Sequence, residues 1–144
     1  MKPEEFLDQL DAARIVAAIG EAERQSSGEI RVYVSHKIRE DALAAAYVRF
    51  QKLGMVRTRQ RNAVLIYFAP RTRQFAVVGD TGVHQKCGDD FWQGISAAMG
   101  AQLRQGKFTE AIVDAIQKTG ALLAQHFPRD PDDRNELPNE IVRG

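Results

Sequence analysis

The stretch Asn62-Ala-Val-Leu-Ile-Tyr-Phe-Ala69 decides the fold, because it is a nearly continuous apolar run. A strand that is covered on both faces has this composition, whereas a half-exposed strand alternates apolar and polar residues. The turn residues Pro70-Arg-Thr-Arg73 follow it, and Gln74–Gly79 then resembles a second strand. The sequence therefore predicts a central strand that pairs with the next strand in an antiparallel hairpin.

Further elements of both kinds lie on either side of this hairpin. Residues 29–35 alternate in polarity, which predicts a strand with one buried face. Apolar spacings of three and four residues predict helices over 4–25 with a break near Asp11, over 41–53, over 89–103 and over 108–127. In the helix over 41–53, the residues expected on the side that packs on the sheet are Leu43, Ala46, Tyr47 and Phe50. This order predicts an α/β fold, a three-layer α/β/α sandwich around a small sheet of at least three strands.

Length and composition restrict the class of protein. A chain of 144 residues with a formal net charge of +1 fits one domain, and it has no overall charge that would attract nucleic acid or an anionic membrane. The single cysteine, Cys87, excludes an internal disulfide framework and a cysteine-rich zinc site. The start of the chain is polar, and no run is apolar enough to span a membrane. We therefore expect a cytoplasmic protein with a reduced thiol.

The most distinctive polar stretch is Gly79–Trp92, which follows the second strand of the hairpin. It contains Asp80, Asp89 and Asp90 close to two glycines. Hard cations such as Ca²⁺ take several oxygen ligands, commonly carboxylates and loop carbonyls, so these three residues are candidate metal ligands. The spacing is not that of an EF-hand, and turn formation or helix capping explains the same aspartates equally well.

A basic segment extends from residue 52, near the end of the helix predicted over 41–53, to residue 73 in the hairpin turn, and it contains no acidic residue. Within it Arg57, Arg59 and Arg61 alternate, so an extended backbone would direct them to one side. Guanidinium groups of this kind suit phosphate or carboxylate ligands, which makes them candidates for anion binding. A solvated loop is the competing interpretation. Nucleic-acid binding is the weaker one, because no recognition helix or aromatic RNA-binding motif accompanies them.

No residue carries a recognisable catalytic signature. Cys87 lacks the arginine spacing of tyrosine phosphatases, and no zinc-protease, Walker or nucleophile-elbow pattern is present. His84 is a loop histidine that is expected to be merely polar, and Glu29 is expected to be a solvated carboxylate at the start of a strand. The catalytic residues, if the protein is an enzyme, are unknown from the sequence.

An ordered set of short motifs resembles the TPM domain family. These motifs are Ile15–Ile30, Phe50–Met55, Arg61–Ile66, Val78–Val83, Gly88–Trp92, Gly106–Phe108 and His126–Pro128. The resemblance identifies residues 1–128 as a TPM-like domain of the soluble bacterial branch and leaves 129–144 as a polar tail. It implies an α/β/α sandwich around a mixed sheet, and it points to calcium binding or acid phosphatase activity, which have been proposed for some members. Ala63 stands where the family often has glycine.

Three functions follow as hypotheses. The first is a binding or accessory module with a divalent cation, such as Ca²⁺, in the Asp80–Asp90 stretch, and with a protein partner that contacts the tail through Ile141-Val142. The alternative is a metal-dependent acid phosphatase, in which the aspartates hold the ion and Arg57 or Arg61 binds phosphate. The third is an anion- or nucleic-acid-binding surface over 57–73.

Overall fold

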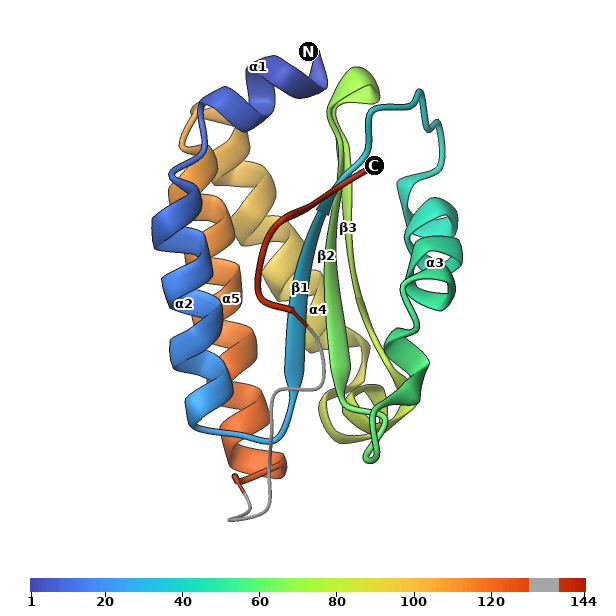
Figure 1. Ribbon diagram of the computed structural model, residues 1–144, viewed down its shortest axis with the longest axis vertical. Coiled ribbons are helices and arrows are strands. Elements are labelled where there is room, and N and C mark those ends of the chain that lie inside the picture. Colours follow the sequence, from blue (N-terminus) through green and yellow to red (C-terminus); the bar gives the residue numbers. More distant parts are fainter. Residues whose placement is uncertain (130–137) are drawn as a thin grey trace.

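The computed structural model describes residues 1–129 and 138–144 (Figure 1). Its helices are α1 (Pro3–Asp8), α2 (Ala12–Arg24), α3 (Ala42–Lys52), α4 (Thr81–Arg104) and α5 (Phe108–His126). Its strands are β1 (Glu29–Val34), β2 (Ala63–Ala69), β3 (Gln74–Gly79) and β4 (Val142–Arg143). Short 3-10 turns lie at Met55–Arg57 and Pro70–Thr72. The predicted break in the first helical segment is confirmed, because the Asp11 side chain caps α2 by accepting from the Arg14 backbone N–H.

The four strands form one mixed sheet in the order β3-β2-β1-β4. β1 is parallel to β2, and α3 makes the crossover between them. β2 and β3 are antiparallel over their full length, from Val64 opposite Gly79 to Ala69 opposite Gln74. The predicted hairpin is therefore confirmed, and β2 is the central strand that its apolar run predicts.

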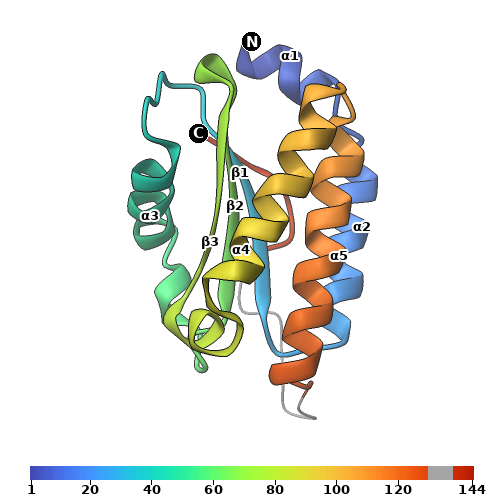
Figure 2. The ribbon, with the colours of Figure 1, turned by 180° about the vertical axis from the view of Figure 1, so that it is seen from behind.

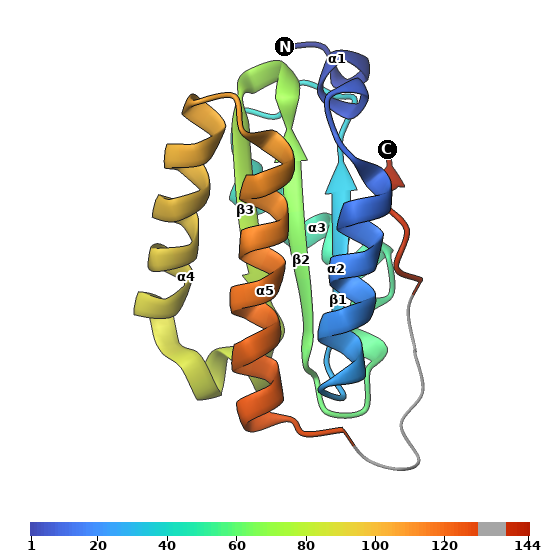
Figure 3. The ribbon, with the colours of Figure 1, turned by 90° about the vertical axis from the view of Figure 1, so that its left-hand side faces the viewer.

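Helices cover both faces of this sheet. Figure 3 shows α2, α4 and α5 in front of the strands and α3 behind them. The alternation along β2 produces these two layers, because Val64, Ile66 and Phe68 belong to the core beneath α2, α4 and α5. Leu65 and Tyr67 belong to the second core, beneath α3. The predicted α/β/α sandwich is therefore confirmed.

β1 differs from its prediction, because all six of its residues are buried rather than alternate ones. Glu29 is 2% exposed, so the expectation of a solvated carboxylate is wrong. The polar residues of β1 face the α3 side, where Tyr33 stacks on Tyr67 with ring centroids 5.3 Å apart and Arg49 lies over the Tyr33 ring. The alternation of the sequence marks the two faces of β1 correctly, but both faces are covered.

α3 also packs differently from the prediction. Its buried side consists of Ala42, Ala46 and Phe50, which lie four residues apart along the helix. Leu43 and Tyr47, which were expected on the same side, are 51% and 56% exposed. A single narrow stripe of two alanines and Phe50 thus holds α3 on the sheet, and Leu43 and Tyr47 beside it face outward.

The last residues of the chain return to the sheet. Val142 and Arg143 pair in parallel with Tyr33 and Val34, and Gly144 exchanges backbone hydrogen bonds with its neighbours on that edge. Ile141 and Val142 pack against the two cores, so this end of the tail docks on its own domain. The part of the predicted tail from 130 to 137 lies outside the described residues.

No helix in the described ranges is both long enough and apolar enough to cross a lipid bilayer.

Candidate functional site

A groove of about 800 Å³ lies along the outer edge of β3, between α3 and the start of α4. One wall is apolar and consists of Leu43, Tyr47 and Val48 on α3, all of them more than half exposed. The opposite wall is polar and comes from α4 and the residues before it. Large exposed apolar side chains beside polar groups are the usual mark of a binding surface.

The groove straddles the edge of the sheet rather than one of its faces. Val77 and Val78 both line it, although Val77 belongs to the core beneath α4 and Val78 to the core beneath α3. Consecutive residues of a strand point to opposite faces, so only a space that wraps around the strand's edge contacts both. The groove therefore contains the edge of β3 itself.

That edge presents free backbone hydrogen-bonding groups. The Asp80 N–H donates to the Ala63 carbonyl at 2.9 Å, which continues the β2–β3 ladder. Residues of the same parity share a direction in an antiparallel ladder, so the N–H and C=O groups of Phe75, Val77 and Gly79 point away from β2. β3 is the terminal strand of the sheet in the described part of the chain, and of these residues Val77 and Gly79 line the groove.

A bidentate ion pair closes one end of the groove. Arg61 donates from Nε and Nη2 to the two carboxylate oxygens of Asp80, at 2.7 and 2.8 Å. The Asp80 side chain is 4% exposed and the Arg61 side chain 47%, so the carboxylate is held inside while the guanidinium reaches solvent. Asp80 also accepts from the Thr81 N–H and begins α4. Its carboxylate raises the pKa of Arg61, which keeps the cation charged.

Backbone contacts fix the same corner. Arg61 has a left-handed conformation with φ of 52°, which is unfavourable for a residue with a side chain. The Gly82 N–H donates to the Arg61 carbonyl at 2.9 Å, and a β-carbon on Gly82 would lie 2.3 Å from the Gln60 carbonyl oxygen. The absence of a side chain at Gly82 thus lets α4 begin directly against the loop that carries Arg61.

His84, Trp92 and Asp89 form a short chain on the polar wall of the groove. The Trp92 indole N–H donates to Nδ1 of His84 at 3.3 Å, and Nε2 of His84 lies 3.5 Å from an Asp89 oxygen. An indole nitrogen can only donate, so Nδ1 of His84 carries no proton and Nε2–H faces Asp89. His84 therefore has defined partners, in contrast to the expectation of a merely polar loop histidine.

The three candidate metal ligands do not converge. Asp80 and Asp89 line the groove, whereas Asp90 lies outside it and is exposed. Asp80 is already bound to Arg61 through both oxygens. Among residues 1–129 and 138–144, no three His, Cys, Asp or Glu side chains are grouped closely enough to hold a metal ion.

The backbone explains this separation, because the predicted loop is helical. α4 begins at Thr81 rather than near Asp89, and Gly88 interrupts it with φ of 73° and ψ of 179°. The predicted helix over 89–103 is present as the part of α4 that follows Gly88, and Gly88 itself is non-helical, as a turn residue would be. The part of α4 over 81–87 was not predicted, and this helical segment separates Asp80 from Asp89 and Asp90 along the chain.

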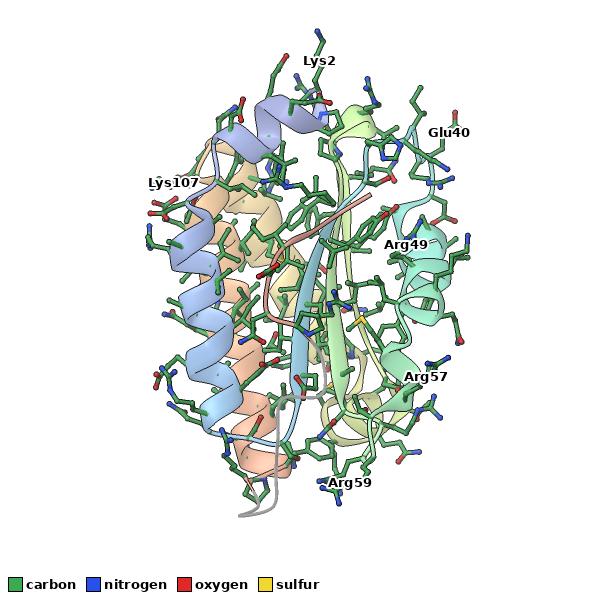
Figure 4. The ribbon with its side chains drawn as sticks, viewed as in Figure 1. Lys2, Glu40, Arg49, Arg57, Arg59 and Lys107 are labelled. Atoms are coloured by element: carbon green, nitrogen blue, oxygen red, sulfur yellow. The ribbon has the colours of Figure 1, made fainter. Side chains whose placement is uncertain are left out.

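The three candidate anion-binding arginines also separate. Arg57 lies in the 3-10 turn and Arg61 has a left-handed conformation, so the backbone is not extended over this segment. Figure 4 shows Arg57 and Arg59 projecting outward at the end of the molecule opposite Lys2. Only Arg61 lines the groove.

Cys87 provides no activated nucleophile. It is half-buried, and burial raises the pKa of its thiol above the ordinary value. A thiol with a raised pKa is less ionised at neutral pH and is a poor nucleophile.

Comparisons with known proteins agree with this fold. A family model described as the TPM domain matches residues 1–122. The BA42 protein of the psychrophilic bacterium Bizionia argentinensis, solved by NMR, is 40% identical, with a TM-score of 0.84 over 94% of this chain and 95% of that chain. The N-terminal domain of the cg2496 protein of Corynebacterium glutamicum is 19% identical, with a TM-score of 0.60 over 77% and 70% of the two chains, and supports the fold alone. No curated protein matches. The chain belongs to the TPM domain family.

Proposed function

We propose that the protein is a binding module that takes up an extended polypeptide segment as an additional strand beside β3. The observation that carries this proposal is the groove around the edge of β3, where Val77 and Val78 from opposite faces line one space. Edge strands with unpaired backbone groups are templates for strand addition. In such complexes the main chain provides affinity, and pockets for alternate side chains provide specificity.

The two walls of the groove suggest the chemistry of this segment. Side chains of an added strand would point alternately toward α3 and toward α4. Those on the α3 side would meet Leu43, Tyr47 and Val48, so they should be apolar. Those on the α4 side would meet His84 and the exposed carboxylate of Asp89, so they should be polar or basic. The expected partner is therefore a strand with alternating polarity.

A capped hexapeptide of alternating valine and lysine tests this proposal. We expect it to slow hydrogen exchange at the outward N–H groups of Val77 and Gly79, which line the groove. Tyr47→Lys should weaken binding about tenfold, because it places a charge on the apolar wall. Ile38→Lys is the matched control, since Ile38 is 69% exposed and lies outside the groove. Equal weakening by both variants, or unchanged exchange along β3, would refute strand addition.

Calcium binding stays a prediction at this site, because Asp80 and Asp89 line the same groove. In this arrangement an ion would compete with the Arg61 guanidinium for Asp80. Arg61→Gln should therefore tighten Ca²⁺ binding about tenfold or more by removing the competing cation, and Asp89→Asn should weaken it. Isothermal titration calorimetry measures both changes. A flat titration for the wild type and for Arg61→Gln would exclude a calcium site here.

A metal-dependent acid phosphatase is the alternative. The ion pair of Arg61 with Asp80 supports it, because such an enzyme needs a phosphate-binding arginine beside its metal-binding carboxylates. In that case Arg61→Gln should abolish turnover of a phosphate monoester, because the guanidinium would bind the phosphate. The same substitution thus tests the two hypotheses through different measurements, Ca²⁺ affinity for the first and phosphate-monoester turnover for the second. Turnover that is unchanged in Asp80→Asn would indicate a contaminating enzyme.

A further inference from the structure

A second pocket, of about 470 Å³, lies at the end of the molecule that carries α1. Figure 2 shows α1, the β2–β3 turn and the turn between α4 and α5 gathered at this end. This pocket shares no lining residue with the β3 groove, so the two spaces are distinct. The volume falls within the range of about 300–1,000 Å³ that is usual for small-molecule sites.

The floor of this pocket is aromatic. Phe6, Phe68, Phe75 and Phe108 all line it. Phe6 is in ring contact with Phe68 and Phe108, at centroid distances of 5.1 and 5.2 Å, and Phe68 lies 6.3 Å from Phe75. These rings belong to α1, β2, β3 and α5. They form a continuous apolar surface that suits a ligand with a hydrocarbon or aryl body.

The rim of the pocket is cationic. The only charged side chains that line it among the described residues are Arg73 and Arg104; Met1, with its amino group, also lines it, and no carboxylate does. A β-carbon on Gly100 would lie 3.2 Å from Nη1 of Arg104 and 3.9 Å from the Phe75 ring, so the Arg104 guanidinium folds back over Gly100 beside the aromatic floor. Within the described ranges neither arginine takes part in a salt bridge, which sets them apart from Arg61.

We propose that this pocket binds a small amphipathic organic anion, with its apolar body on the phenylalanine floor and its carboxylate or phosphate head on Arg73 and Arg104. The two parts of the ligand follow from two independent features, the aromatic floor and the cationic rim. Guanidinium groups bind such heads through charge-assisted hydrogen bonds. A cationic or neutral amphiphile would leave both guanidiniums without a partner, so the site should select against it.

Titration of the full chain with octanoate, followed by two-dimensional NMR, tests the proposal. Octanoate should shift the backbone signals of Gly100, Leu103 and Gly106, which line the pocket. Octylammonium has the same tail with the opposite charge, and acetate has the same head without the tail. Both should bind at least about tenfold more weakly, because each lacks one of the two complementary parts.

Two variants connect this binding to the rim. Arg104→Gln and Arg73→Asn should each weaken octanoate binding about tenfold. Asparagine suits position 73, because Arg73 has a left-handed φ of 53° that asparagine tolerates. Arg59→Gln, at the other end of the molecule, is the matched control and should leave binding unchanged. Equal affinity for octylammonium, signal shifts confined to the β3 groove, or unchanged binding in both rim variants would overturn the proposal.

Discussion

Gly82→Ala is expected to lower the free energy of unfolding by about 2–3 kcal/mol, because it overpacks a rigid contact. The added β-carbon would lie 2.3 Å from the Gln60 carbonyl oxygen and 2.6 Å from that of Arg61. Both are backbone atoms, so relief requires α4 to move away from the loop. That movement would also break the Gly82–Arg61 hydrogen bond and loosen the ion pair of Arg61 with Asp80. Urea denaturation measures the loss of stability.

Gly94→Ala is the control, because Gly94 lies in the same helix and its β-carbon would meet no atom within 4 Å. Alanine there should raise stability by up to about 1 kcal/mol through helix propensity. Both substitutions replace glycine with alanine in the same helix. Changes of opposite sign in the free energy of unfolding would therefore show that the contact of Gly82 with the loop causes the loss of stability. Similar effects at both positions would contradict the close approach of α4 to residues 60–61.

Gly120→Ala is expected to cost about 2 kcal/mol despite its better helix propensity. Gly120 lies where α5 crosses α2, and a β-carbon would lie 2.7 Å from the Ala22 β-carbon. Ala22 has no flexible end that could move aside, so the two helices would have to separate. Thermal or urea denaturation measures the change.

A double-mutant cycle sharpens this second prediction. Ala22→Gly removes the obstructing β-carbon and should cost about 1 kcal/mol by itself, through helix propensity. In the presence of Ala22→Gly, the Gly120→Ala substitution should cost little, which gives a coupling energy of about 1–2 kcal/mol. If the two effects simply add, the crossing contact is not what makes glycine necessary at position 120.

Much of the fold could be predicted from the sequence. The apolar run at Ala63–Ala69 and the turn after it are local patterns, and they correctly predict the central strand and the hairpin. The spacing of apolar residues likewise predicts α2 and α5 closely. These elements are strongly periodic, and the packing of the sheet does not override them.

The predictions that failed depend on tertiary contacts. The two Gly-Asp pairs suggest a loop from Gly79 to Gly88, but Asp80 caps a helical segment there, and the aspartate followed by Val83 and Cys87 at helical spacing was a usable signal. The burial of Glu29 could not be anticipated, because it depends on coverage of the second face of β1.

The candidate site was predicted only in part. The stretch after β3 that the sequence singles out contributes Asp80 and Asp89 to the groove. The pairing of Asp80 with Arg61 was not foreseen, since it joins residues 19 positions apart through a left-handed backbone. The outward-facing side of α3 was also missed, because the periodicity shows which residues are apolar but not how wide a stripe the sheet covers.

The position of β4 has a consequence for stoichiometry. Its pairing with Tyr33 and Val34 occupies the carboxyl end of the β1 edge, while on the opposite side of the sheet Val77, Val78 and Gly79 of β3 line the groove. A sheet that can extend in both directions can join copy after copy into a filament, whereas one that is blocked on one side accepts a single addition. Under the proposed strand addition, Val142 and Arg143 on β1 would therefore favour complexes that stop at one partner.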